Sequence, residues 1–226
     1  MQAVILAAGR GKRMKHLTRA TTKPMLKIKG RPILEYKISI LPKKIKEIIF
    51  VVGYHSMHII SHFKRYYGGH KIIYVFQNNI NGTGGAIHLA RSILKDNFLV
   101  LMGDDLYCKK DVAELVKYDS AILGYEVHKP GQFGVIKTDS KGHMLDVIEK
   151  PKSLKYNLAN TGAYVLNKKF FDYDLVPIGH GEFGLPQTLA KMARDHKIKV
   201  IKATRWHPIG TPEDLKEAEK LIGDFI

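Results

Sequence analysis

The segment from Ala3 to Lys23 constrains the fold more than any other part of the chain. Residues 3–6 form a short apolar run of the kind that a fully buried parallel strand shows. The small residues that follow let the backbone turn closely beneath a ligand, so that main-chain N–H groups face it. They are Ala7, Ala8, Gly9 and Gly11. We therefore predict a buried strand that ends in a phosphate-binding loop.

Basic side chains surround the predicted loop: Arg10, Lys12, Arg13 and Lys23. Fixed positive charge binds a triphosphate and stabilises the charge that develops during its transfer. The glycines alone are a weak signal, because they complete neither the P-loop pattern GxxxxGK[ST] nor the dinucleotide pattern GxGxxG. A tight strand-to-helix turn with solvated basic residues is the alternative interpretation.

The rest of the amino-terminal half alternates between strand and helix patterns. Apolar runs predict strands, and helical spacing predicts helices, the second of them with Ser56 as its cap. The strands are expected at 48–52, 71–76 and 98–102, and the helices at 32–41, 57–66 and 86–94. This order predicts an α/β fold with a doubly wound, Rossmann-like mixed sheet that is mostly parallel. Ligands of such sheets collect at the carboxyl ends of the strands.

The carboxyl-terminal half is richer in strands. We predict strands at 121–127, 133–136, 144–148 and 158–166, with a hairpin turn at 139–142. A helix at 185–194, a strand at 199–203 and a closing helix at 212–222 with Thr211 as its cap follow. We expect a single domain over residues 1–226, with one half at about 1–120 and another at about 121–226.

Composition narrows the range of partners. The chain has 226 residues, one cysteine and no apolar run near the ~20 residues of a membrane span, and its start lacks the features of a secretion signal. We expect a cytoplasmic protein without a membrane partner, as a monomer or a homo-oligomer. The formal net charge of +16 suits either nucleic acid or small polyanionic substrates. Because the lysines are scattered, without a basic arm or an aromatic platform, we expect no nucleic-acid partner.

A longer pattern is much more specific than the glycines. LAAG-x-G-x-R-M at 6–14, followed by K-P-M-L at 23–26 and by Gly30–Tyr36, resembles the amino-terminal signature of the sugar-1-phosphate nucleotidylyltransferases. The resemblance extends over most of the chain and implies the nucleotide-diphospho-sugar transferase type of fold, with an inserted sugar-binding β portion. It implies phosphate contacts and catalytic roles for Arg13 and Lys23. The loop residues that it places beneath a nucleotide are Leu6, Ala8, Gly9 and Gly11.

Base recognition is expected from two segments at the ligand-binding edge. Gln77 follows one predicted strand, and Asn81–Ala86 precede a predicted helix, so amide, hydroxyl and glycine backbone groups meet there. The spacing from Gln77 to Gly82 and Thr83 resembles the base-binding segment of the uridylyltransferases in this family. It therefore favours UTP or dTTP. A glycine-rich helix entry capped by Thr83 is the alternative.

Asp104 and Asp105 follow the predicted strand at 98–102 and are candidates for a cation site. Mg²⁺ prefers one or two carboxylates together with phosphate oxygens and water. The resemblance assigns the metal, and a catalytic role, to Asp104, with Asp105 as a candidate second ligand. The loop Trp206–Leu215 resembles W-x-D-[IV]-G-T-P-E-D-L, but Pro208 stands where the pattern has a metal-binding aspartate. How the metal is held without that carboxylate stays open.

Three motifs in the second half, FGVI, IEKP and NTGAYVL, resemble the sugar-binding part of the same family. By that resemblance Gly134, Glu149 and Asn160 contact a sugar, and Lys150 lies near its phosphate. A sugar pocket needs such fixed polar groups and a glycine where a ring packs on the backbone. Taken singly, a hairpin glycine and a surface Glu-Lys pair explain the same residues. Glu182 matches a further acidic position of the family.

The resemblance implies a Mg²⁺-dependent enzyme that converts a nucleoside triphosphate and a sugar 1-phosphate to a nucleotide sugar and pyrophosphate. Such a transfer needs positioning and charge neutralisation without a covalent intermediate, so no Ser-His-Asp or Cys-His set is expected. Three alternatives stay open: a cytidylyltransferase that acts on a small alcohol phosphate, a catalytically silent nucleotide-sensing relative, and a nucleic-acid-binding protein. The motifs do not identify the sugar.

Overall fold

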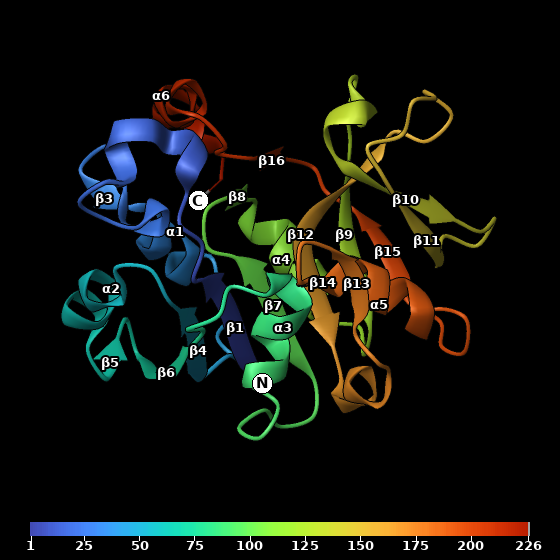
Figure 1. Ribbon diagram of the computed structural model, residues 1–226, viewed down its shortest axis with the longest axis horizontal. Coiled ribbons are helices and arrows are strands. Elements are labelled where there is room, and N and C mark those ends of the chain that lie inside the picture. Colours follow the sequence, from blue (N-terminus) through green and yellow to red (C-terminus); the bar gives the residue numbers. More distant parts are fainter. Residues whose placement is uncertain (226) are drawn as a thin grey trace.

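A ten-stranded sheet runs through the computed structural model, which describes residues 1–225 (Figure 1). Eight strands lie in the order β11-β10-β12-β7-β1-β4-β6-β5, and β9 joins β12 to the edge strand β15. The bounds are β1 Gln2–Ala7, β4 Glu47–Val52, β5 Tyr66–Tyr67, β6 His70–Phe76, β7 Phe98–Met102, β9 Ala121–Glu126, β10 Gly134–Thr138, β11 Met144–Glu149, β12 Leu158–Leu166 and β15 Lys199–Lys202.

Strand direction confirms the predicted mixed sheet. β1 pairs in parallel with β4 and β7, and β4 pairs in parallel with β6, so the amino-terminal half is doubly wound. β12 runs antiparallel to β7, β9 and β10, and thereby joins the carboxyl-terminal half to the same sheet. The carboxyl ends of β1, β6 and β7 meet at one edge.

Helices cover both faces of the sheet. They are α1 Ile33–Ser39, α2 Ser56–Phe63, α3 Gly82–Leu89, α4 Lys109–Leu115, α5 Leu185–Met192 and α6 Pro212–Leu221. Short 3-10 helices are η1 Lys12–Thr18, η2 Lys23–Met25, η3 Pro130–Gln132, η4 Lys168–Asp172 and η5 Ile222–Asp224. Residues 1–225 also hold three two-stranded ribbons: β2 Lys27–Ile28 with β3 Arg31–Pro32, β8 Leu106–Tyr107 with β16 Trp206–His207, and β13 Val176–Gly179 with β14 Glu182–Gly184.

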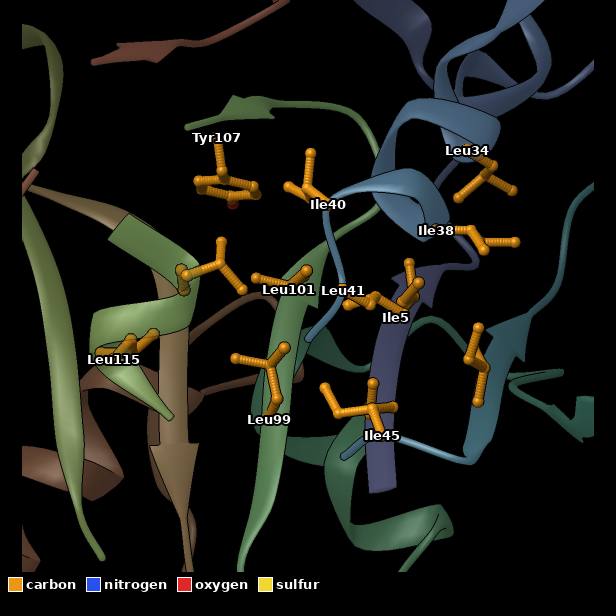
Figure 2. Close-up of a cluster of buried hydrophobic side chains, with 14 of the residues drawn as sticks. Ile5, Leu34, Ile38, Ile40, Leu41, Ile45, Leu99, Leu101, Tyr107 and Leu115 are labelled. Atoms are coloured by element: carbon orange, nitrogen blue, oxygen red, sulfur yellow. The ribbon is translucent and has the colours of Figure 1, made fainter. Parts of the chain in front are cut away.

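The alternation of side chains along each strand builds a core on either face. Ile5 of β1 and Leu101 of β7 point toward the segment that carries Ile38 and Leu41 (Figure 2). Val4 and its neighbours pack on the opposite face against α3 and α5. Each fully buried leucine or isoleucine contributes about 1.5–3 kcal/mol. A third cluster holds α6 against the amino-terminal segment, where the red and blue ribbons lie together in Figure 1.

Most predicted strands are confirmed within one or two residues, and the capping box of Thr211 with Asp214 is present at α6. The helix predicted at 57–66 is too long, because Lys64 adopts φ 52° and Tyr66–Tyr67 pair with β6 instead. His55, not Ser56, is its N-cap residue.

Other elements were missed or displaced. The helix predicted to begin at residue 86 begins at Gly82. The elements η1, α4 and the β13–β14 ribbon were not predicted. None of the helices in residues 1–225 combines the length and the apolar character that crossing a membrane requires.

Candidate active site

A cavity of about 430 Å³ lies at the edge where β1, β6 and β7 end, and this volume suits a small ligand. Its wall comes from the loop after β1, the start of α3, the loop after β7 and the β13–β14 ribbon. The structure brings together in it most of the residues singled out for phosphate, base and metal: Leu6, Ala8, Gly9, Gly11, Arg13, Lys23, Gln77, Gly82, Thr83 and Asp104.

Gly11 determines how the loop after β1 turns toward the cavity. It has φ 61°, in the left-handed region that favours glycine, and a Cβ here would lie 3.0 Å from Cβ of Lys23. Its carbonyl accepts hydrogen bonds from the Met14 N–H at 2.9 Å and from the Thr18 hydroxyl at 3.1 Å. The backbone that carries Lys12 and Arg13 is therefore anchored on either side.

Lys23 and Asp104 form the central ion pair of the cavity. Lys23 Nζ lies 2.6 Å from Asp104 Oδ2, and the two side chains are 9% and 33% exposed. Arg13 lines the same cavity, and its Nη1 lies 3.5 Å from where a Cβ on Gly210 would be. Two cations and one carboxylate thus converge beside the glycine loop.

The available oxygen donors fit a cation only in part. Within residues 1–225 no group of three or more His, Cys, Asp or Glu side chains could hold a metal ion. Asp104 lines the cavity, whereas Asp105 does not and accepts a hydrogen bond from Trp206 Nε1 at 3.1 Å. Because Mg²⁺ accepts one carboxylate when phosphate oxygens and water complete its shell, Asp104 alone fits it. The structure gives no support to Asp105 as a second ligand.

Sequence reasoning missed a buried lysine behind this site. Lys37 of α1 is 1% exposed, and its Nζ has no hydrogen-bond partner in the described chain. The ammonium lies 4.2 Å from the centre of the Tyr107 ring. A signal was available, because Lys37 occupies the helix face of Ile33, Leu34 and Leu41, which are all buried.

Burial lowers the pKa of the Lys37 ammonium to about 7, against the attraction of Asp105 and Asp104. Desolvation, and then the charge of Asp104, raise the pKa of the Asp105 carboxyl to about 7. Burial therefore disfavours the charged form of Lys37 and the charged form of Asp105.

The polar groups at the base end of the cavity are held by hydrogen bonds. Gln77 is 4% exposed, and its Nε2 donates to Asn81 Oδ1 at 2.9 Å and to the Gly82 carbonyl at 3.1 Å. Thr83 Oγ1 accepts from the Leu185 N–H at 3.1 Å. Gly82 is required for space and backbone angle, since it has φ +86° and its Cβ would lie 2.4 Å from the Phe183 carbonyl oxygen.

The β13–β14 ribbon forms the outer wall. Ile178 and Glu182 of this ribbon line the cavity, together with Ile80. Glu182 is the acidic residue that the sequence had already singled out. The signal for the ribbon itself was weak: two short extended segments flank the turn Gly179–Gly181, in which all three residues have positive φ.

The four residues predicted to bind a sugar lie together but outside the 430 Å³ cavity. Gly134 pairs with Glu149 across β10 and β11, Lys150 follows directly, and the pairing of β10 with β12 brings Asn160 beside Gly134. Asn160 donates to the Tyr164 hydroxyl at 2.8 Å and accepts from the Gly162 N–H at 3.0 Å.

Gly162 connects this group to the cavity. A Cβ at Gly162 would lie 2.5 Å from Cγ of Met102, and Met102 lines the cavity. The predicted sugar residues therefore stand at the same end of the sheet as the phosphate loop.

Comparisons with known proteins show which proteins the chain resembles. A family model described as nucleotidyl transferase matches residues 2–224. Over 229 residues the chain is 35% identical to the bifunctional protein GlmU of Methanocaldococcus jannaschii, covering 100% of this chain and 55% of that protein. It is 31% identical over 235 residues to the UTP–glucose-1-phosphate uridylyltransferase AglF of Haloferax volcanii, covering 98% and 96% respectively.

The fold has close relatives among solved structures. A crystal structure described as a glucose-1-phosphate thymidylyltransferase of Bacillus anthracis superposes with a TM-score of 0.88 at 25% identity, covering 100% of this chain and 96% of that one. The chain spans about half the length of the bifunctional relatives, 55% in the Methanocaldococcus protein.

Replacing the buried lysine tests the electrostatics behind the site. Lys37→Met keeps the volume and removes a charged group whose burial lowers its pKa, so we expect the free energy of unfolding at pH 7 to rise. Between pH 7 and 10.5 the folded wild type has already lost a proton that the unfolded chain retains, so its stability rises with pH. The advantage of the variant should therefore shrink over that range, as measured by urea denaturation. A less stable variant at pH 7 would show that attraction to Asp105 and Tyr107 outweighs burial.

Proposed function

The chain belongs to the nucleotidyl transferase family, and from that premise we propose that it is a sugar-1-phosphate nucleotidylyltransferase. It joins a nucleoside triphosphate to a sugar 1-phosphate and releases pyrophosphate. The observation that carries the proposal is the Lys23–Asp104 pair beside the glycine loop, in one cavity with Arg13. Anionic phosphates need this convergence of fixed positive charge.

The reaction is proposed as a single displacement. An oxygen of the sugar 1-phosphate attacks the α-phosphorus, a P–O bond forms there, and the bond to the β-phosphate oxygen breaks as pyrophosphate leaves. Arg13 and Lys23 bind the phosphates, hold them in line and neutralise the charge that the leaving group gains. Because these side chains act by position and charge, no protein nucleophile is required.

Asp104 is the proposed ligand of Mg²⁺. Its Oδ2 accepts from Lys23, and Oδ1 is left for a cation. When bound, Mg²⁺ would supply further charge neutralisation to the phosphates. Lys23 holds the carboxylate of Asp104 at the cavity wall.

The hydrogen bonds of Gln77 favour a uracil or thymine base. Both amide hydrogens of Gln77 are donated to Asn81 and Gly82, so Oε1 is the atom left to meet a base. Uracil and thymine present an N3–H donor to such an acceptor, whereas cytosine presents an acceptor at N3. We therefore propose UTP or dTTP as the nucleotide, with Gly82 and Thr83 lining the rest of the base site.

The sugar would lie over Gly134, with Glu149 and Asn160 meeting its hydroxyl groups and Lys150 near its phosphate. The strand pairing that gathers these residues next to the Met102 end of the cavity supports this assignment. A nucleotide-sensing protein without turnover is the second candidate, because Pro208 supplies no carboxylate where the family pattern has one.

Pyrophosphate release tests the activity. With UTP or dTTP and a panel of sugar 1-phosphates, we expect Mg²⁺-dependent release by the wild type. Arg13→Ala and Lys23→Ala should each lower kcat/KM by about a hundredfold or more, because each removes a charged contact that strengthens in the transition state. Asp104→Asn should nearly abolish the response to Mg²⁺.

Arg19→Ala is the control, since Arg19 is exposed and lies outside the cavity. Normal kinetics in both Arg13→Ala and Lys23→Ala would remove those residues from the catalytic set. Tight UTP binding by a wild type that turns over no sugar phosphate would favour the sensing protein.

Nucleotide competition tests the base assignment. We expect kcat/KM for UTP or dTTP to exceed that for CTP by at least about a hundredfold, because cytosine would set its N3 acceptor against Gln77 Oε1. Gln77→Ala should reduce this ratio chiefly by lowering the rate with UTP. Preferred use of CTP would instead support a cytidylyltransferase, and preferred use of GTP would contradict the assignment altogether.

A further inference from the structure

Lys12 occupies a position that the proposed mechanism does not use. It lines the 430 Å³ cavity and also an adjoining open groove of about 650 Å³, which Arg10, Asn79 and Glu182 help to form. Arg10 lines only the groove. Lys12 is thus the cation that lines both the cavity and the groove.

The charges around Lys12 leave it available for an anion. Among residues 1–225 the cavity is lined by three cations, Lys12, Arg13 and Lys23, and by the carboxylates of Asp104 and Glu182. Lys23 is matched by Asp104, whereas Lys12 has no carboxylate within 4.0 Å in that part of the chain. The backbone at Lys12 is nevertheless fixed in position, because Gly11 and the buried Met14 anchor it on either side.

The same region is poor in donors for a cation. Asp104 is the carboxylate that we assign to Mg²⁺, Glu182 belongs to the outer wall, and Pro208 contributes no carboxylate. A triphosphate or a departing pyrophosphate carries several negative charges, and those beyond the reach of one cation need other positive groups. An ammonium on an anchored loop, next to Arg13 and open to the adjoining groove, meets that need.

We propose that Lys12 is a further phosphate-binding residue, which with Arg13 holds the outer phosphates of the triphosphate and the leaving pyrophosphate by side-chain charge, without a bound cation. The inference rests on the proposed function, because it takes the cavity to be a triphosphate site. Its consequence is that the chain binds inorganic pyrophosphate in the absence of any divalent metal.

Calorimetric titration of the full chain with inorganic pyrophosphate tests this, once in excess EDTA and once in Mg²⁺. We expect the wild type to bind pyrophosphate in EDTA. Lys12→Gln should weaken that binding by at least about tenfold, the usual effect of losing one charge-assisted contact. Lys12→Arg, which keeps the charge, should stay within about threefold of the wild type.

Lys15→Gln is the matched control. Lys15 is exposed on the same 3-10 segment, carries the same charge and does not line the cavity, so its replacement should leave pyrophosphate binding unchanged. Thermal unfolding of each variant confirms that the fold is intact.

Two results would overturn the proposal: a wild type that binds no pyrophosphate without Mg²⁺, or equal affinities in Lys12→Gln and Lys15→Gln. Failure of the proposed function would look different. Binding that depends on Lys12, together with no turnover of any triphosphate and sugar phosphate tested, would support the assignment of Lys12 and reject the activity.

Discussion

The ion pair between Lys23 and Asp104 is the interaction on which the rest of the site depends. It joins η2 to the end of β7, two segments that are 81 residues apart in the chain, with 2.6 Å between Nζ and Oδ2. A lysine side chain that is only 9% exposed needs such a partner, because an unpaired ammonium at that depth would be costly. The pair therefore fixes both charges before a phosphate arrives, which is the preorganisation that electrostatic catalysis requires.

Close approach of the backbones in the sheet brings the end of β1 next to the end of β7. The parallel pairing of β1 with β7 places their ends side by side, and the Gly103 N–H donates to the Leu6 carbonyl at 2.9 Å. A Cβ at Gly103 would lie 2.8 Å from that oxygen, so only glycine lets the next residue, Asp104, reach the cavity. The antiparallel β12 then places Gly162 against Met102, so both halves of the chain meet at one edge.

The sequence predicts those features of the fold and of the site that depend on local pattern. Alternating apolar runs predicted the doubly wound sheet, and the rule that ligands gather at strand ends placed the glycine loop, Gln77 and Asp104 together. Contacts between distant segments could not be predicted. The hydrogen bond from Trp206 Nε1 to Asp105 joins residues 101 positions apart, and no local pattern predicts it.

The same limit applies to the buried charge and to the outer wall. Helical spacing places Lys37 on the apolar face of α1, but its position beside Tyr107 depends on the packing of α1 against β8. The position of the β13–β14 ribbon depends on a contact between distant segments, in which the Phe183 N–H donates to the Asn81 carbonyl at 2.8 Å. The contacts of Lys37 and of the ribbon arise from tertiary packing, which periodicity and motif spacing do not predict.

The most direct test of the central claim is a crystal structure of the chain with an α,β-methylene analogue of UTP, whose altered bridge prevents transfer. We expect the phosphates on the loop between Ala8 and Arg13, within hydrogen-bond distance of Lys23, and the uracil N3–H on Oε1 of Gln77. An analogue bound elsewhere, or one bound in the cavity with its phosphates turned away from Arg13 and Lys23, would contradict the account.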